Sequence, residues 1–355
     1  MTTEKVFGFA LLGCGDMGMH LAQQGATIDG VRVVAGADVD ADRRARFTET
    51  FEGAHAAATV GEALAQSGVD AVIVASPPFL HRELVEAAAA AGKHVFCEKP
   101  LAPTLADCDA IIAACARANV RLMTGQVLRY IQPFATVHDL VVKQRVIGKV
   151  FGMEMRRFGA GWGGGARSWR NEGAATGGML MEINAHEMDL LRYISGEVTT
   201  VDARLGRYHH EAFDFADFAY VLFGMASGGA GSLHASLASA LGSTEGMLHG
   251  TEGSLSYRWQ SGAAITYARF GQEKPTEVTP QSTEEPYRRE LREFVEAVHG
   301  GVEPTITGAD GRKAVELALA AYTSSAQGRV VTLPLGVDQA APAGGLPLIT
   351  LKGRG

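Results

Sequence analysis

Glu98 and Lys99 form a charged pair at the end of an apolar run, HVFC at residues 94–97, and Pro100 follows directly. A lysine ammonium in such a place can orient a substrate oxygen and stabilise negative charge that develops on it. The simpler interpretation is a solvent-exposed strand end that carries an ion pair. The choice between the two depends on the elements that surround the pair.

A second group of reactive side chains lies in the segment GGMLMEINAHEMDLLRYISG, residues 177–196. Its apolar pattern predicts a helix over about 177–195, and residues four apart share one face of a helix. Glu182 and His186 would therefore point the same way, and an imidazole, which titrates near neutral pH, can take a proton from a hydroxyl. The alternatives are a core histidine and, for the nearby Asp189, a structural hydrogen-bonding role.

A glycine-rich turn, GCGDMG at residues 13–18, fits the pattern GxGxxG between a predicted strand and a predicted helix. The first glycine would permit a tight bend, the second a close approach of a pyrophosphate, and the third close packing of helix on strand. The next strand ends at Asp38, which would bind the adenosine ribose and repel a 2′-phosphate. Val39 follows it, and not an arginine. The pattern predicts NAD rather than NADP; the alternative is a structural turn with a solvated aspartate.

Alternating strands and helices position these residues in the first part of the chain. Strands are predicted over about 6–12, 31–38, 70–76, 93–99 and 120–127, with helices over about 17–25, 41–51, 60–66, 81–92 and 105–119. Nearly continuous apolar strands between helices indicate a parallel sheet covered on both faces, an α/β Rossmann domain.

Ligands bind at the carboxyl edge of such a sheet. Residues that follow the later strands are therefore predicted to line the cofactor, although His81 could instead only begin its helix. The full set of predicted cofactor-binding residues is Gly13, Gly15, Asp16, Met17, Gly18, Asp38, Ser76, Pro77, His81, Glu98 and Lys99.

The second part of the chain has a different pattern. After about residue 149, strand-like stretches succeed one another and are joined by turns such as ASGG and TEGS. They predict an α+β domain with a large, mostly antiparallel open sheet and a helix on one face. The predicted domains are an NAD-binding Rossmann domain over 1–125, a substrate and oligomerisation domain over 126–335, and a tail over 336–355. The helices over 287–328 could pack back on the first domain.

Composition excludes several classes of protein. The 355 residues carry a net charge of −7, which gives no basic surface for nucleic acid. No segment reaches the roughly 18 apolar residues that a membrane span needs. The first residues of the chain also lack the features of a signal peptide. Four cysteines with no disulfide pattern make a reducing cytoplasm the expected setting. The pair His209-His210 lacks further ligands, so we expect no metal ion. The four cysteines lack the spacing of a zinc site or a disulfide framework: Cys14, Cys97, Cys108 and Cys115.

The turn GCGDMG, Asp38, the EKP at 98–100 and the segment with His186 together resemble the Gfo/Idh/MocA oxidoreductases, which include glucose–fructose oxidoreductase and inositol 2-dehydrogenase. The resemblance runs through nearly the whole chain, including GQVLRYIQPF (125–134), IGKVFGMEMRRF (147–158), PYRRELREFVEAV (286–298) and TGADGRKAVELALAAYTSSAQGRVVTLPL (307–335). It implies NAD-dependent oxidation of a secondary hydroxyl of a sugar, inositol or related polyol.

By the same resemblance, Lys99 contacts the substrate and assists proton transfer, and His186 is the acid/base. The chain departs from the family pattern at Glu182, where the family has aspartate. The carboxylate then sits about one methylene farther out, which should shift the substrate geometry. This departure weakens the assignment of the protein as an inositol dehydrogenase.

A loop rich in glycine, AGWGGGARSWR at 160–170, precedes the histidine segment. Trp162 and Trp169 could pack on the apolar face of a sugar, and Arg167 and Arg170 could donate to its hydroxyls. Arg129 ends a segment at the same sheet edge and is also predicted to line the substrate. The alternative for the loop is an ordinary connection anchored by tryptophan packing.

Two other functions remain open at this point. The enzyme could retain NAD and use transient oxidation to cleave or eliminate a glycoside, or the protein could be a non-catalytic sensor of NAD and sugar. The presence of both Lys99 and His186 argues against the sensor. The small residues of GGAGSLHASLAS (228–239) also predict a homodimer or homotetramer built on the open sheet face.

Overall fold

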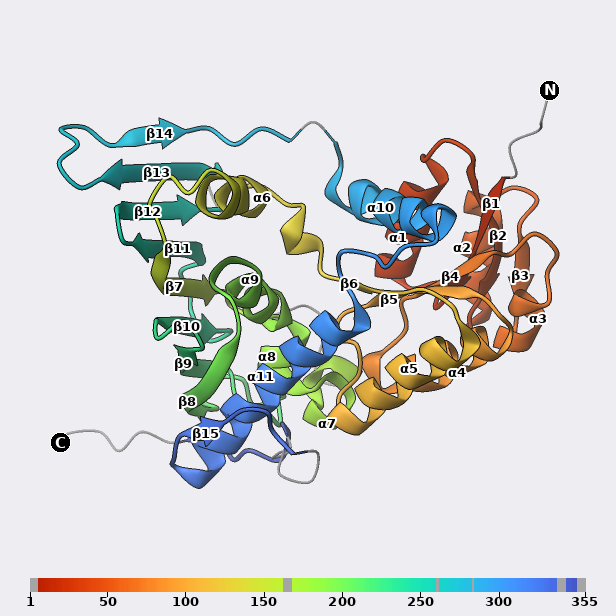
Figure 1. Cartoon of the computed structure of the whole chain (residues 1–355). Coiled ribbons are helices and arrows are strands. Elements are labelled where there is room, and N and C mark those ends of the chain that lie inside the picture. The colour runs from red at the N-terminus through yellow and green to blue at the C-terminus, as the bar shows by residue number, and fades with distance from the viewer. Residues whose placement is uncertain (1–5, 162–167, 260–261, 283, 337–342, 350–355) are drawn as a thin grey trace. The chain divides into compact units, whose positions relative to one another are not determined.

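The computed structural model describes residues 6–161, 168–259, 262–282, 284–336 and 343–349. The chain forms two compact units, one of Met1–Tyr130 with Thr283–Arg312 and one of Ile131–Ser282 with Lys313–Gly355 (Figure 1). The first unit thus extends past residue 125 and takes in a segment from the last quarter of the chain.

The first unit is built on a six-stranded parallel sheet with the strand order β3-β2-β1-β4-β5-β6. Its strands are β1 (Phe7–Leu12), β2 (Val31–Ala37), β3 (His55–Ala57), β4 (Ala71–Val74), β5 (His94–Glu98) and β6 (Leu122–Gly125). The connecting helices are α1 (Asp16–Ala26), α2 (Ala41–Thr50), α3 (Val60–Leu64), α4 (His81–Ala90) and α5 (Leu105–Ala118), with 3₁₀ turns at Pro78–Leu80 and Val127–Arg129. The predicted parallel α/β domain is confirmed. Sequence analysis missed β3, which has three residues and no apolar run.

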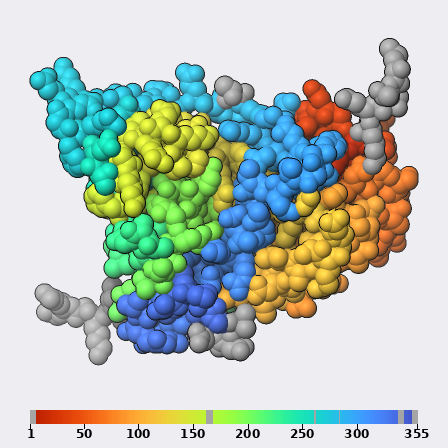
Figure 2. Space-filling view, in the orientation of Figure 1, coloured from red at the N-terminus to blue at the C-terminus, as the bar shows by residue number. Residues whose placement is uncertain are grey.

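Helix α10 (Pro286–Gly300) completes the first unit by packing on α1, and the two lie side by side in Figures 1 and 2. Its residues Leu291 and Phe294 are fully buried in the same core cluster as Phe9 and Phe96 of the sheet. One face of the parallel sheet is thus covered by a helix that arrives from far along the sequence.

The second unit is built on a nine-stranded sheet with the order β14-β13-β12-β11-β7-β10-β9-β8-β15. Neighbouring strands are antiparallel except β7 and β10, which run parallel. The strands are β7 (Val150–Phe158), β8 (Val198–Gly206), β9 (Phe218–Met225), β10 (Ala230–Ser236), β11 (Ser243–Gly250), β12 (Gly253–Arg258), β13 (Ala264–Arg269), β14 (Thr276–Val278) and β15 (Val331–Thr332). The predicted mostly antiparallel sheet is confirmed.

Helices of the second unit lie on one side of this sheet (Figure 1). They are α6 (Phe134–His138), continued by a π-turn at Asp139–Lys143, then α7 (Gly173–Thr176), α8 (Gly178–Glu182), α9 (Ala185–Ser195) and α11 (Gly308–Gln327), whose first turn belongs to the first unit; a 3₁₀ turn spans Trp169–Asn171. Serine hydroxyls of α11 accept hydrogen bonds from the backbone N–H groups of β8, Ser324 from Ala203 and Ser325 from Leu205, both at 3.0 Å.

The continuous helix predicted over about 177–195 is wrong. It is interrupted at Ile183 and Asn184, whose ψ angles of −52° and 3° at φ of −109° and −92° leave the regular helix. Asn184 precedes the first residue of α9, and its side-chain amide donates to the Glu187 carboxylate at 3.0 Å. The argument that Glu182 and His186 share a face by helical spacing therefore does not apply.

Among the described residues, no helix is long and apolar enough to cross a membrane. The same residues contain no group of three or more His, Cys, Asp or Glu side chains that could hold a metal ion. All four cysteines are buried and free.

Candidate functional site

Two glycines after β1 stand where no side chain fits. Gly13 has a φ of +99°, and a Cβ there would lie 2.9 Å from the carbonyl oxygen of Ala75, just past β4. A Cβ on Gly18, in the first turn of α1, would clash with the carbonyl oxygen of Gly13. These are the tight bend and the close helix–strand packing that a dinucleotide-binding turn needs.

Gly15 differs from both because it faces open space. It precedes α1 in extended conformation, and a Cβ on it would meet no atom within 4 Å. As a glycine, Gly15 supplies no side chain to cap α1. A helix start with room above its backbone can stabilise a phosphate group through its N–H groups. The turn therefore fits the pyrophosphate of a dinucleotide.

Asp38 lies directly after β2 and is fixed beside this turn. Its Oδ2 accepts the backbone N–H of Cys14 and its Oδ1 that of Asp40, each at 2.9 Å. Burial, together with the Asp38 charge, raises the pKa of the Cys14 thiol to about 12, so the thiol stays protonated. The Arg43 guanidinium lies 3.6 Å from Asp38 Oδ2. Sequence analysis missed this cation, because Arg43 is five residues further along and only the start of α2 brings it back.

Asp16 and Met17 lie in the exposed first turn of α1. The Asp16 carboxylate pairs with Arg46 of α2 at 2.8 Å, and Arg46 also donates to the Cys14 carbonyl at 3.0 Å. These contacts connect α2 to the glycine turn. Direct binding of a cofactor by the two side chains stays a prediction.

The turn after β4 brings Ser76 and Pro77 to the carboxyl edge of the sheet, where both are half-buried. The ring of His81, which begins α4, is 0% exposed. Its Nε2 lies 2.9 Å from the Ser76 carbonyl oxygen, and its Nδ1 3.1 Å from that of Pro100. The ring thus offers no surface to a ligand and contacts the backbone of two turns instead.

Glu98 and Lys99, at and just after the end of β5, have different surroundings. Glu98 is buried; a Cβ on its cross-strand neighbour Gly125 would lie 3.4 Å from the carboxyl carbon, so the carboxylate occupies the space that the glycine leaves. Its Oε2 accepts the backbone N–H of Lys99 at 3.0 Å. Lys99 is half-buried at the carboxyl edge of the sheet. The glutamate therefore holds the backbone from which the lysine side chain leaves.

Arg129 is tied to the first unit by its own contacts. Its guanidinium lies 3.5 Å from the Asp310 carboxylate and donates to the Thr305 carbonyl at 3.3 Å, and the side chain is only 8% exposed. This arrangement anchors the chain after β6 to the segment that enters α11. A substrate contact by Arg129 stays a prediction.

In the second unit, Glu182 ends α8 and is almost fully buried. Its Oε1 lies 3.5 Å from the Arg170 guanidinium, which in turn lies over the Trp169 ring at 5.6 Å. Three of the residues predicted to serve the substrate therefore form one cluster. Trp162 and Arg167 lie outside the described residues.

His186 lies in the first turn of α9 and is half-buried. Next to it, Glu187 is buried and pairs with Arg157 of β7 at 2.8 Å while accepting the Asn184 amide. The Asn184 Oδ1 is buried and has no hydrogen-bond partner among the described residues. Sequence analysis did not assign a role to Glu187 or Arg157, because a buried pair between a helix and a distant strand leaves no local pattern. Asp189 is also buried.

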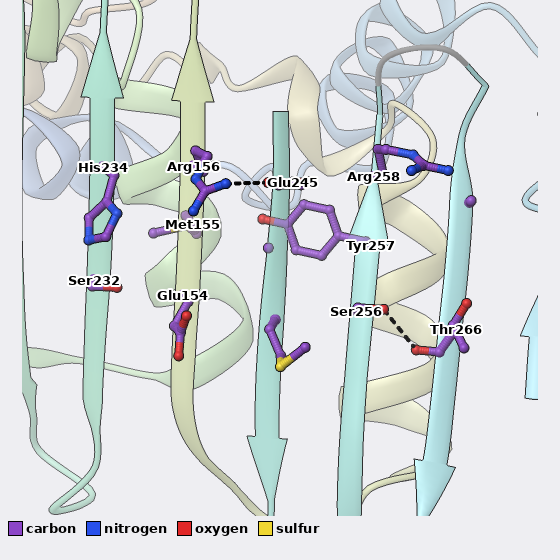
Figure 3. A pocket seen from close by; sticks show the side chains of 13 residues that line it. Glu154, Met155, Arg156, Ser232, His234, Glu245, Ser256, Tyr257, Arg258 and Thr266 are labelled. Atoms are coloured by element: carbon purple, nitrogen blue, oxygen red, sulfur yellow. Dashed lines mark hydrogen bonds and ion pairs between the residues drawn. The ribbon is translucent and has the colours of Figure 1, made fainter. Parts of the chain in front are cut away.

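A hollow of about 350 Å³ lies on the nine-stranded sheet. Figure 3 shows its lining side chains on β7, β10, β11, β12 and β13, with Arg156 paired to Glu245 at 2.7 Å. The lining residues come from adjacent strands and belong to neither of the groups above: Glu154, Met155, Arg156, Ser232, His234, Glu245, Gly246, Met247, Ser256, Tyr257, Arg258, Ala264 and Thr266.

A parallel sheet with an open glycine turn and a fixed aspartate after its second strand is typical of a dinucleotide-binding domain. The family comparison agrees: residues 7–126 match the model of the oxidoreductase family with an NAD-binding Rossmann fold, and residues 134–256 match the GFO/IDH/MocA C-terminal domain. The chain belongs to the Gfo/Idh/MocA oxidoreductases.

Several characterised relatives span nearly the whole chain. D-apiose dehydrogenase of Paraburkholderia graminis is 29% identical over 96% of this chain and 93% of its own length. Myo-inositol 2-dehydrogenase of Thermotoga maritima is 29% identical over 91% of this chain and 97% of its own length. Among solved structures, an oxidoreductase from Agrobacterium radiobacter in complex with NAD⁺, L-tartaric acid and magnesium superposes with a TM-score of 0.83 at 25% identity, covering 92% of this chain and 98% of that one.

Proposed function

We propose that the protein is an NAD-dependent dehydrogenase that oxidises a secondary hydroxyl of a sugar, inositol or related polyol. The observation that carries the proposal is Lys99, held by Glu98 at the carboxyl edge of a parallel sheet whose glycine turn suits a dinucleotide. The names of the two relatives, one a dehydrogenase of D-apiose and one of myo-inositol, support the substrate class.

The residues of the first unit would hold NAD in a definite order. The open turn at Gly15 would receive the pyrophosphate, and the Asp38 carboxylate the adenosine ribose hydroxyls. Bound NAD would supply the hydride acceptor for oxidation of the carbinol carbon. We expect NAD to bind better than NADP because Asp38 would repel a 2′-phosphate, although Arg43 offers that phosphate a cation 3.6 Å from the carboxylate.

Three side chains would act on the substrate. The Lys99 ammonium would orient the oxygen of the reacting hydroxyl and stabilise negative charge on it. The unprotonated ring nitrogen of His186 would take the hydroxyl proton. Glu182 would accept a hydrogen bond from a neighbouring substrate hydroxyl, and its pairing with Arg170 would orient the carboxylate for that contact.

A screen of sugars, inositols and polyols with NAD, followed by the absorbance of NADH, tests the proposal. Steady NADH formation with one or more of them is expected. Cofactor that stays bound through purification, with product but no net NADH, would replace this function by the retained-cofactor chemistry. Binding of NAD and sugar with no turnover of any kind would favour the alternative that the protein is a non-catalytic sensor.

We also propose that two copies associate through the side of the nine-stranded sheet that carries the hollow. Apolar side chains stand on that side between buried neighbours: Leu222 is 58% exposed while Val221 and Phe223 are buried. Tyr220 and Met247 are also exposed there, beside charges of both signs such as Arg156 and Glu154. A surface that mixes apolar side chains with both signs of charge can pair with itself.

Light scattering at micromolar concentration tests this association, with a dimer or tetramer expected for the unaltered protein. Leu222→Asp should shift it toward the monomer, because a desolvated carboxylate would stand against the partner sheet. Val39→Asp, a charge at a residue that is 92% exposed in the other unit, is the matched control. A monomeric unaltered protein would refute the proposal.

A further inference from the structure

The imidazole of His81 lies between two turns of the first unit and has no exposed surface. On one side its Nε2 lies 2.9 Å from the carbonyl oxygen of Ser76, in the turn after β4. On the other its Nδ1 lies 3.1 and 3.3 Å from the carbonyl oxygens of Pro100 and Leu101, in the turn after β5. One side chain thus reaches the backbone of both turns.

All three of these backbone partners can only accept hydrogen bonds, and a neutral imidazole donates from one nitrogen alone. The Cys97 thiol also contacts the ring, with its Sγ 3.5 Å from Nδ1. Burial raises the pKa of the Cys97 thiol well above its usual value, so it keeps its proton. Buried carbonyl groups need donors. A neutral His81 ring donates to one of the two turns, and a protonated ring donates to both.

The second of these turns is the one that carries Lys99. The Lys99 backbone N–H donates a hydrogen bond to Glu98 Oε2 at 3.0 Å. The carbonyl groups contacted by His81 belong to the next two residues, Pro100 and Leu101. The Lys99 backbone is therefore restrained on both sides, by a carboxylate before it and by an imidazole after it.

The first turn is itself placed against the candidate cofactor site. The carbonyl oxygen of Ala75, one residue before Ser76, is the group that a Cβ on Gly13 would meet at 2.9 Å. A continuous path of contacts thus leads from the glycine turn through the turn after β4 to His81 and then to the turn of Lys99. All of these residues belong to the first unit.

We propose that His81 is a positioning residue: it ties the turn of Lys99 to the turn beside the glycine motif and so fixes where the Lys99 ammonium stands relative to a bound dinucleotide. This inference rests on the proposed function, since it gives Lys99 its task at the substrate oxygen. A displacement of a catalytic group by about 1 Å can cost on the order of a hundredfold in rate. The same tie would be a stability feature alone if Lys99 had no part in turnover.

Two substitutions separate the two ends of the ring. An asparagine amide reaches the position of Nδ1 and a glutamine amide that of Nε2, so His81→Asn keeps a donor near Pro100 and Leu101, and His81→Gln keeps one near Ser76. We expect kcat to fall by about ten- to a hundredfold in His81→Gln and by less in His81→Asn, because only the asparagine still holds the turn of Lys99. The affinity for NAD should change little in both variants.

Thr104→Ala is the matched control. Thr104 caps α5, three residues after Leu101, by accepting the Asp107 N–H at 3.1 Å. Its loss should lower the melting temperature without changing kcat of the folded enzyme. If the His81 variants also lost only thermal stability, or if His81→Gln kept more turnover than His81→Asn, the positioning role would be refuted.

Hydrogen exchange of the peptide that contains residues 97–103 supplies a readout that needs no turnover. We expect faster exchange there in His81→Gln than in His81→Asn or in Thr104→Ala, measured on the unliganded protein. If His81→Gln left the exchange of residues 97–103 unchanged, His81 would not hold the turn of Lys99. If the unaltered protein oxidises no sugar or polyol, the proposed function fails, and the exchange result still decides whether His81 holds this turn.

Discussion

Two helix starts carry the candidate chemistry, and they are built in opposite ways. Helix α1 begins after Gly15, where there is no side chain, and a Cβ would meet nothing within 4 Å. Helix α9 begins after Asn184, whose amide is bound to Glu187, and Glu187 is in turn bound to Arg157 of the sheet. The first start leaves room over the backbone, whereas the second is filled by buried polar side chains.

The difference fits the roles proposed for the two regions: a cofactor end, formed by the glycine turn and Asp38, and a substrate end, formed by Lys99, Glu182 and His186. A backbone start with open space suits a phosphate group, which needs N–H groups and proximity more than any particular side chain. The start of α9 carries the buried pair of Glu187 with Arg157. Such a pair would give Glu182 and His186 the fixed surroundings that their proposed contacts with substrate hydroxyls need. Cofactor binding and substrate turnover should therefore respond to different substitutions.

The largest effect is expected for Lys99→Ala. Loss of the ammonium that stabilises the substrate oxygen should lower kcat by about a hundredfold or more, while NAD binding stays largely intact. Parallel measurement of turnover and of NAD affinity checks this. A variant with normal turnover, or one that no longer binds NAD, would break the proposed division between the two ends.

Asp38→Ala addresses the cofactor end. Loss of charge-assisted hydrogen bonds worth about 1.5–3 kcal/mol should weaken NAD binding by roughly ten- to a hundredfold and narrow the gap to NADP. Arg43→Ala should widen that gap, because it removes the cation nearest to Asp38. Titration with both cofactors measures the effects.

Asp40→Ala is the control for this pair. Asp40 caps α2 by accepting the N–H groups of Asp42 and Arg43 at 2.9 and 3.2 Å. Its loss should cost about 1 kcal/mol of stability and leave NAD affinity unchanged. A clear preference for NADP in the unaltered protein would contradict the role given to Asp38.

Glu182→Gln addresses the substrate end and should have a smaller effect. The neutral amide keeps a hydrogen bond but loses the charge, so kcat/KM should fall by about tenfold with NAD affinity unchanged. Arg170→Ala separates the alternatives, because Arg170 pairs with Glu182 at 3.5 Å. If both variants lowered only the melting temperature and left the kinetic constants alone, Glu182 would serve the ion pair and not the substrate.

The smallest effect is expected at His94, which belongs to the same unit as the cofactor end but lies at the opposite end of β5 from Lys99. Burial, aided by the charge of Arg121, lowers the pKa of His94 below its ordinary 6.5, and its Nδ1 accepts the Arg121 N–H at 2.9 Å. Because the folded protein disfavours the protonated ring, stability is complete above about pH 6.5 and declines as the pH falls below it. His94→Asn retains an acceptor that does not titrate, so its melting temperature should drop less between pH 7 and pH 5. An identical drop would show that another group titrates.

The fold was predictable where local patterns repeat. Buried apolar strands between helices predict the parallel sheet, and turns between short strands predict the second sheet. The return of α10 to the first unit was open in the sequence, because its amphipathic face does not say against which element it packs. The helix break at Ile183 and Asn184 falls inside an apolar pattern that has no proline and no turn signal, so the sequence pattern did not indicate it.

The two candidate sites differ in the same respect. Gly13, Gly15 and Gly18 occur at a spacing set by backbone geometry, so the sequence could indicate the turn. The pairs Arg170–Glu182 and Arg157–Glu187 join residues whose separation along the chain has no fixed value. Arg43 became visible beside Asp38 only once the first turn of α2 was in place. Side-chain constellations of this kind need the fold before they can be found.

A single series of NAD titrations tests the central claim most directly. Binding should be measured calorimetrically for the unaltered protein and for Lys99→Ala, Glu182→Gln and Asp38→Ala under the same conditions. The account predicts that Asp38→Ala alone loses affinity, by about tenfold or more, while the other two bind NAD like the unaltered protein. Equal affinity in all four proteins, or loss in Lys99→Ala and Glu182→Gln, would contradict a cofactor end that is built separately from the substrate end.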